Sequence, residues 1–211
     1  MISDDYSDAL ITEEEELRAK YGKVSELAAK KCVSQLDAHT RKFIKLSPFL
    51  CISSSRSTGP ADISPRGDAP GFVVAIDDKH IVIPDRTGNN RLDTASNILS
   101  NPHIGLIFMV PGLNETLRIN GRAFICAAAE LLTRFEVRGK VPKTGILVEI
   151  DEVMFQCTKA LVRSHLWRED YKVDRDVMPT LGEILKDQIT TDKTAEEAER
   201  AIQESINKRL Y

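Results

Sequence analysis

Two arginines lie at the predicted start of a helix, where they could bind an anion. The segment IVIPDRTGNNRLDTASNILSNP, residues 81–102, ends a strand, turns, and offers Asn89 or Asn90 as a helix cap. The first turn of a helix presents backbone N–H groups without partners, and these groups bind anions. Arg86 and Arg91 add positive charge where helices usually carry acids. The pattern predicts a phosphate site, unless both arginines pair with the neighbouring aspartates.

A third arginine belongs to a segment rich in proline and glycine, SPRGDAPGF, at residues 64–72. Pro65 fixes its own φ angle, while Gly67 and Gly71 allow backbone conformations closed to other residues. We therefore expect a rigid loop that holds Arg66 against a planar or phosphorylated ligand. The alternative is a surface ion pair between Arg66 and a nearby aspartate.

The composition limits the classes of partner. The chain has 211 residues, 42% of them hydrophobic, and a net charge of -3. This size is enough for one domain with a real core, and the negative charge argues against nucleic acid or an anionic membrane as the main partner. The N-terminus is acidic, and no apolar run approaches the roughly 18 residues of a spanning helix. We expect a cytoplasmic protein.

The four cysteines and four histidines are scattered along the chain. No C-x-x-C pair occurs, so neither a zinc site nor a redox dithiol is predicted. We expect reduced thiols and no metal.

The spacing of apolar residues changes from helical to strand-like and back again, which divides the chain into three regions. Residues 1–46 are predicted to be a helical extension, residues 47–167 a β-rich core, and residues 168–211 a linker followed by helices. The core reads as a hairpin-rich antiparallel sheet, with strands expected at residues 49–53, 72–76, 80–83, 103–110, 116–125 and 145–155. The fold class is therefore mainly β with peripheral helices.

Capping boxes and apolar spacing predict where the helices begin and which side of a helix faces the core. Capping boxes are expected at Thr12, Thr180 and Thr194, because each is followed three residues later by glutamate. In the helix near residue 90, the apolar residues Leu92, Ala95 and Leu99 are expected to face the core.

Four blocks in this order resemble the FMN-binding split-barrel family of the pyridoxamine 5'-phosphate oxidases, and more closely a branch of that superfamily with uncharacterised reactions. They are DISPRGDAPGFV, IPDRTGNNRLDTASNIL, LIFMVPGLNETLRINGRA and CTKALVRSHLW, and the resemblance covers roughly residues 40–167. It implies an antiparallel split β-barrel.

The resemblance also implies cofactor-binding residues for FMN. Arg66 matches an arginine that reaches the FMN phosphate or the flavin edge, and the phosphate-gripping segment matches Asn89, Asn90 and Arg91. Where the oxidases place a basic pair, this chain has Asn90-Arg91, so Arg86 or Arg66 must supply the second positive charge. Other positions implied to lie around the flavin are Ile83 and Pro84 behind the ring, Thr116 facing it, and the neighbours Glu115 and Arg118.

The last block implies a contribution from a second subunit. Lys159, Ser164 and Trp167 belong to a basic and aromatic cluster at residues 157–167, and the tryptophan ring could cover a flavin face. The Arg-Ser-His run inside this cluster is similar to the substrate-binding arginine and histidine of the true oxidases. In those enzymes, however, the run lies near the chain's end, whereas here a long helical tail follows. This difference puts pyridoxamine phosphate in doubt as the substrate.

The expected protein is a homodimer with flavin at the subunit interface, acting as an FMN-dependent oxidoreductase on a small molecule. Because the flavin itself carries the electrons, no catalytic residue needs to show in the sequence. The alternatives are a non-catalytic flavin or small-ligand carrier or sensor, a true pyridoxamine phosphate oxidase, and a structural dimer that has lost its ligand.

Overall fold

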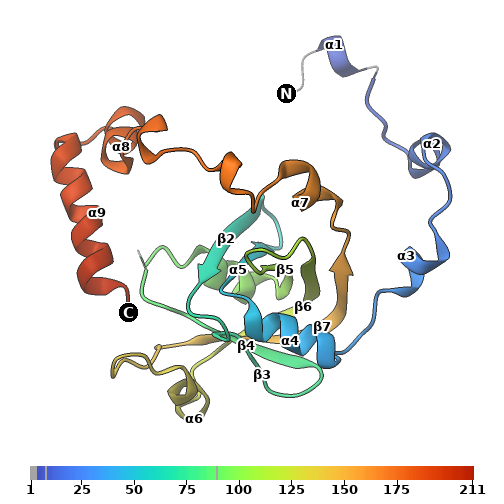
Figure 1. Cartoon of the computed structure of the whole chain (residues 1–211), viewed down its shortest axis with the longest axis horizontal. Coiled ribbons are helices and arrows are strands. Elements are labelled where there is room, and N and C mark those ends of the chain that lie inside the picture. The colour runs from blue at the N-terminus through green and yellow to red at the C-terminus, as the bar shows by residue number, and fades with distance from the viewer. Residues whose placement is uncertain (1–3, 8, 89) are drawn as a thin grey trace. The chain divides into compact units, whose positions relative to one another are not determined.

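The computed structural model describes residues 4–7, 9–88 and 90–211 (Figure 1). The chain divides into two compact units, residues 1–32 and 33–211. The first unit contains three short helices, α1 (Asp4–Ser7), α2 (Glu14–Lys20) and α3 (Glu26–Lys30). The Ser25 side chain caps α3, but the cap expected at Thr12 is wrong. Helix α2 begins one residue too late for that cap, so Glu13 takes the N-cap position and makes no side-chain cap bond.

The second unit is built on one antiparallel sheet of seven strands in the order β2-β1-β5-β6-β7-β4-β3. The strands are β1 (Phe49–Ser55), β2 (Ala61–Gly67), β3 (Val74–Ala75), β4 (His80–Pro84), β5 (His103–Met109), β6 (Thr116–Cys126) and β7 (Gly145–Gln156). The mainly antiparallel β fold with helices toward both ends of the chain is confirmed.

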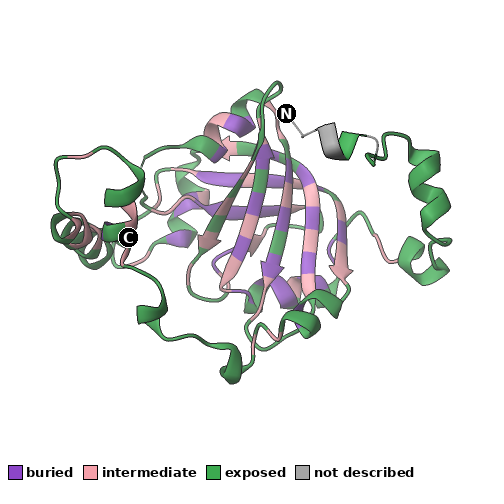
Figure 2. Cartoon of the chain, turned by 90° about the horizontal axis from the view of Figure 1, so that it is seen from above, coloured by how far each residue is buried: buried purple, intermediate pink, exposed green. Residues whose placement is uncertain are grey.

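Alternation along the strands separates the core from the opposite sheet face, as the bands of buried and exposed residues in Figure 2 show. In β6, Leu117, Ile119 and Ala123 are buried, whereas Arg118 and Arg122 point to the other side. Helix α4 (Ala38–Leu46) closes part of the core with buried apolar side chains.

The remaining helices surround the sheet or follow it. They are α5 (Asp93–Ser100), α6 (Ala129–Leu132), η1 (Thr133–Phe135), α7 (Lys159–Ser164), η2 (Glu169–Tyr171), η3 (Arg175–Val177), α8 (Leu181–Gln188) and α9 (Ala195–Arg209). The capping boxes expected at Thr180 and Thr194 are confirmed, since each side chain accepts from the N–H three residues later. None of the helices in the described ranges is long and apolar enough to cross a membrane.

The segment expected to be a rigid loop around Arg66 is instead an edge strand. Residues Ala61–Gly67 pair with β1 along their whole length. Pro65 is tolerated there because an edge strand leaves alternate N–H groups without a partner strand. Arg66 therefore projects from a strand, on the same side as the buried Leu50 opposite it. In contrast, the strand expected at residues 72–76 is reduced to Val74–Ala75.

Helix α5 faces the core with a different side from the one expected. Leu92 and Leu99 are 56% and 79% exposed, whereas Thr94, Asn97 and Ile98 are buried. The polar pair can be buried because each finds a partner: Asn97 Nδ2 donates to Ser54 Oγ at 3.0 Å, and the Thr94 hydroxyl accepts from Arg66. Counting apolar residues alone therefore selected the wrong face.

Asp37 caps α4, and its removal should destabilise the protein measurably. Its carboxylate accepts from Thr40 N at 2.8 Å, and this hydrogen bond is the main reason that the pKa of Asp37 lies below its usual value. We expect Asp37→Ala to lower the free energy of unfolding by about 1 kcal/mol in urea denaturation. Asp37→Asn should lower the free energy of unfolding much less, because asparagine also caps helices. An equal decrease in both variants would contradict the capping role.

Candidate functional site

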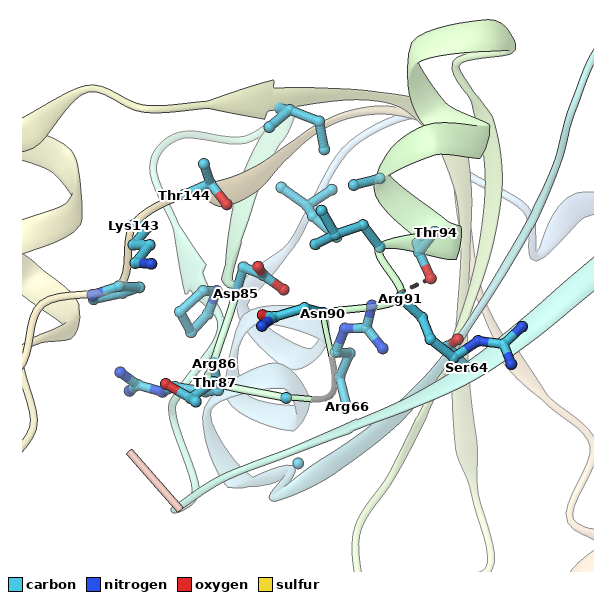
Figure 3. Close-up of a pocket in the computed structure, with 18 of the residues that line it drawn as sticks. Ser64, Arg66, Asp85, Arg86, Thr87, Asn90, Arg91, Thr94, Lys143 and Thr144 are labelled. Carbon is cyan, nitrogen blue, oxygen red and sulfur yellow. Dashed lines mark hydrogen bonds between the residues drawn. The ribbon is translucent and has the colours of Figure 1, made fainter. Parts of the chain in front are cut away.

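A cavity of about 890 Å³ lies between strand β2, the connection from β4 to α5, and the segment that leads into β7 (Figure 3). Strands β2 and β4 belong to opposite halves of the sheet, yet residues of both line this cavity. Its apolar wall is formed by Phe72, Pro84, Ile125 and Ile146. The cavity is therefore a product of the curved sheet rather than of any one segment.

Basic and hydroxyl side chains gather on one side of the cavity, which we call the anion corner: Ser64, Arg66, Asn90, Arg91 and Thr94. Strand β2 positions the first two, and the turn before α5 positions the others. Arg66 donates to Thr94 Oγ1 at 3.2 Å and to the carbonyl oxygen of Pro65 at 2.8 Å. Its guanidinium is thus held beside the first turn of α5, whose N–H groups favour negative charge.

Arg91 comes from the turn, and its side chain runs past Ser64 with its guanidinium pointing away from that of Arg66 (Figure 3). Its Nε donates to Asp93 Oδ2 at 2.7 Å, and this hydrogen bond raises the pKa of the guanidinium. The side chain is 73% exposed, so the pair with Asp93 is a weak surface contact that an anion can compete with.

The turn is held in unusual backbone conformations. Asn90 and Leu92 have φ angles of 58° and 59°. Asparagine adopts this left-handed region readily, but leucine does so rarely, and such strained residues cluster at ligand-binding turns. The strain supports a functional role for this turn.

Arg86 lies on the other side of the cavity from Ser64 and Thr94 (Figure 3). Its Nε donates to Asp68 Oδ2 at 2.6 Å, and Nη1 donates to the carbonyl oxygen of Phe135 at 2.6 Å. Burial opposes ionisation of Asp68, but hydrogen bonds from the Tyr211 hydroxyl, Ala69 N–H and Arg86 outweigh it and lower the pKa. Arg86 is therefore engaged within the protein, and Arg66 is the second guanidinium at the anion corner.

The other residues implied by the resemblance fall into separate places. Ile83 is fully buried in the core behind Pro84. Asn89 lies outside the described residues. Glu115 is exposed just before β6. The remaining residues, Thr116, Arg118, Lys159, Ser164 and Trp167, lie at the opposite end of β6 or on the segment after β7.

Two of these residues line a second hollow of about 480 Å³. Thr116 and Lys159 line it together with Ile107, Met109 and residues of α7. Trp167 Nε1 donates to the carbonyl oxygen of Leu113 at 2.7 Å, in the loop before β6. The two hollows lie on either side of β1, because Pro65 of the main cavity and Ile107 of the second hollow both pair with Cys51.

Several residues at the main cavity were missed by sequence reasoning: Ser64, Thr94, Lys140, Lys143, Thr144 and Tyr211. A signal did exist for Ser64, because Asp62, Ser64 and Arg66 recur with the period of a strand. Nothing local marked Tyr211, which is brought to the cavity only by the folding of the C-terminal helices.

The fold and the cavity together define a class of mainly antiparallel β proteins with a cavity lined by strands from both halves of the sheet. The sequence profile of the pyridoxamine 5'-phosphate oxidase family matches residues 36–157, more than half of the chain. The chain belongs to this family.

Solved structures with low sequence identity are similar to about half of the chain. HupZ of Group A Streptococcus is 17% identical, with a TM-score of 0.46 over 56% of this chain and 91% of its own. An FMN-binding protein of Syntrophomonas wolfei is 11% identical, with a TM-score of 0.43 over 56% and 88%. The FAD binding protein of Mycobacterium smegmatis is 14% identical, with a TM-score of 0.41 over 59% and 97%. No curated protein has a matching sequence.

Proposed function

We propose that this protein binds FMN in the main cavity and acts as a flavin-dependent oxidoreductase on a small molecule. The observation that carries the proposal is the anion corner, where Arg66 lies beside the first turn of α5 and Arg91 lines the same cavity. An anion would draw the exposed Arg91 side chain toward Arg66. Family membership supports a flavin as the ligand. The bound flavin would supply hydride or electron transfer, and the residues of this chain would bind, orient and shield it.

The residues present fit FMN. Cofactor sites commonly measure about 300–1,000 Å³, and this cavity of about 890 Å³ lies within that range. Two guanidinium groups and the N-terminal end of α5 match a doubly charged phosphate. The apolar wall of Phe72, Pro84 and Ile125 offers a surface for a planar ring.

A second copy of the chain would complete the site. The main cavity and the second hollow share no lining residue among those described. Arg66 points to the core side of the sheet with Leu50, whereas Ile107 and Thr116 point to the opposite face. A twofold dimer could place the Thr116 and Lys159 hollow of one copy beside the main cavity of the other, with flavin at the interface.

The sheet face opposite the core carries apolar groups suited to such a dimer. We call it the outer sheet face, with Cys51, Ile107, Met109, Phe124 and Met154 on it. Ile107 and Phe124 are 37% and 45% exposed. Arg118 pairs there with Glu152 at 2.6 Å, while its Nε is buried without a partner among the described residues. A second copy would cover this face.

Titration with FMN tests the proposed function directly. Quenching of flavin fluorescence should give a micromolar or tighter dissociation constant, equivalent to about 8 kcal/mol. Bleaching of the bound flavin by NADH or NADPH, with recovery in air, would support an oxidoreductase. Bound flavin that neither donor reduces would favour a carrier or sensor, and a protein that takes up no FMN would refute the proposal.

A charge on the outer sheet face should separate the dimer and weaken FMN binding together. We expect Ile107→Glu to elute as a monomer in size-exclusion chromatography at micromolar concentration and to bind FMN at least about tenfold more weakly, because a buried unpaired carboxylate costs several kcal/mol. Val177→Glu, at a residue 63% exposed in η3, is the matched control and should change neither. A monomeric Ile107→Glu protein with unchanged FMN affinity would place the whole site within one subunit.

A further inference from the structure

The C-terminal helices α8 and α9 pack mainly on each other. Among the described residues, neither helix packs extensively on a strand of the sheet. The two helices approach closely at Gly182, where a Cβ atom would lie 2.4 Å from the carbonyl oxygen of Ala195. Glu199 Oε2 also accepts from Gly182 N at 3.0 Å. We call residues 180–209 the helix pair, because these contacts join α8 and α9 into one element.

Little apolar surface holds the helix pair on the rest of the protein. Within the described ranges, no apolar side chain of α8 or α9 is buried. Ile206 and Leu210, at the far end of α9, are 48% and 54% exposed. The connection from the sheet, residues 168–179, is exposed along its whole length. Because buried apolar area is the main force that holds elements together, detachment of the helix pair costs little free energy.

Tyr211, two residues after α9, anchors the helix pair at the main cavity. Its hydroxyl donates to Asp68 Oδ1 at 2.8 Å, and its backbone oxygen accepts from Lys140 Nζ at 2.5 Å. The guanidinium carbons of Arg86 and Arg138 each lie 5.5 Å from the centre of its ring. The hydroxyl, the ring and the backbone of one residue are therefore all held by groups of the sheet domain.

The groups that receive Tyr211 are held in place without it. The Asp68 side chain is only 4% exposed and also accepts from Ala69 N and Arg86 Nε. Arg86 donates in turn to the carbonyl oxygen of Phe135. The turn at residues 137–140 is closed by two backbone hydrogen bonds of 3.0 and 2.9 Å. Tyr211 can therefore leave and return without rearrangement of its binding site.

The position of Tyr211 decides how open the main cavity is. Tyr211 lines the cavity together with Arg86 and Lys140. The cavity measures about 890 Å³ with Tyr211 in place, which is enough for a cofactor, so a bound ligand and Tyr211 do not compete. Departure of Tyr211 would remove part of the wall and open the cavity on this side.

We propose that the helix pair is a lid on the main cavity, with Tyr211 as its latch and residues 168–179 as its hinge. The lid opens when Tyr211 leaves Asp68, and ligands enter and leave the cavity while it is open. This assignment rests on the proposed function for the identity of the ligand, FMN. The rate of ligand exchange then depends on the fraction of molecules whose lid is open.

Loosening of the latch should speed both the entry and the release of FMN. In stopped-flow fluorescence, we expect Tyr211→Ala to raise the association and dissociation rate constants at least about tenfold each, because the lid is then open more of the time. The dissociation constant should change much less than either rate constant. A residue that merely contacts bound FMN would affect the dissociation rate constant alone.

Arg138 allows a sharper test, because it contacts the ring of Tyr211 without lining the cavity. We expect Arg138→Gln to raise both rate constants at least about threefold, since it weakens the latch and leaves the ligand site intact. Arg134→Gln removes the same charge from an exposed residue of η1 that does not line the cavity, and it should change neither. Unchanged association rate constants in Tyr211→Ala and Arg138→Gln would overturn the proposal.

The latch can also be observed without flavin, by ¹⁹F NMR of protein labelled with 3-fluorotyrosine. The Tyr211 signal, identified by its absence from Tyr211→Phe, should differ from that of Tyr21, which is 69% exposed. In Arg138→Gln it should move toward the signal of Tyr21. A Tyr211 signal at the exposed position in the unaltered protein would refute the latch. Because this measurement contains no flavin, a failure to take up FMN would count against the proposed function alone.

Discussion

Replacing both Arg66 and Arg91 with alanine should weaken FMN binding at least about a hundredfold. Each guanidinium that contacts a phosphate contributes charge-assisted hydrogen bonds of about 1.5–3 kcal/mol, and the two residues reach the anion corner from different elements. The combined loss is then about 3–6 kcal/mol, out of roughly 8 kcal/mol for a micromolar ligand. Fluorescence titration of the double variant measures it.

Riboflavin gives the sharpest comparison, because it has the same ring and ribityl chain but no phosphate. The double variant should bind riboflavin about as well as the unaltered protein does. A matched control, Arg175→Ala with Arg200→Ala, removes the same charge from residues that do not line the cavity and should leave FMN affinity unchanged. If FMN and riboflavin lose affinity equally, the anion corner does not bind the phosphate.

The second large effect is expected at Gly121, where β6 and β7 change register. The pairing shifts between Asn120 and Gly121, and a Cβ atom at Gly121 would lie 2.1 Å from the carbonyl oxygen of Glu149. Backbone on both strands would have to move, at the centre of the sheet. We expect Gly121→Ala to lower the free energy of unfolding by about 3 kcal/mol, near the upper end for overpacking, and the melting temperature by about 6–12 °C.

A glycine in open surroundings provides the comparison. A Cβ atom at Gly59 would meet only the Arg56 side chain at 3.5 Å, which is an ordinary contact. Gly59→Ala should therefore melt within about 2 °C of the unaltered protein. Similar melting temperatures for Gly59→Ala and Gly121→Ala would show that the strands accommodate the added methyl group.

Much of the fold was readable from the sequence because local patterns agreed with the final packing. The strand predicted at residues 116–125 is β6, and the capping boxes at Thr180 and Thr194 marked true helix starts. The errors arose where a distant partner reversed a local preference. Asn97 is buried because Ser54, on another strand, accepts its hydrogen bond. Pairing with β1 likewise turned the expected loop around Arg66 into a strand.

The candidate site was readable only in part. Arg66, Asn90 and Arg91 were predicted to lie near one another, and the structure brings them to one corner of one cavity. Arg86 was placed with them by sequence proximity, yet Asp68 and Phe135 hold it on the other side. No short-range pattern could reveal these partners of Arg86, because Phe135 is 49 residues away from it in the chain.

The sequence by itself determined the alternation of strands, the helix caps, the family and the residue types that favour an anion. These features depend on neighbours a few positions apart, and their free energies are set locally. Only the tertiary structure decided which guanidinium reaches the anion corner, that Lys159 lines a separate hollow, and that Tyr211 borders the cavity. Those placements depend on how the curved sheet joins distant segments, because burying one apolar core fixes contacts that no stretch of sequence specifies alone.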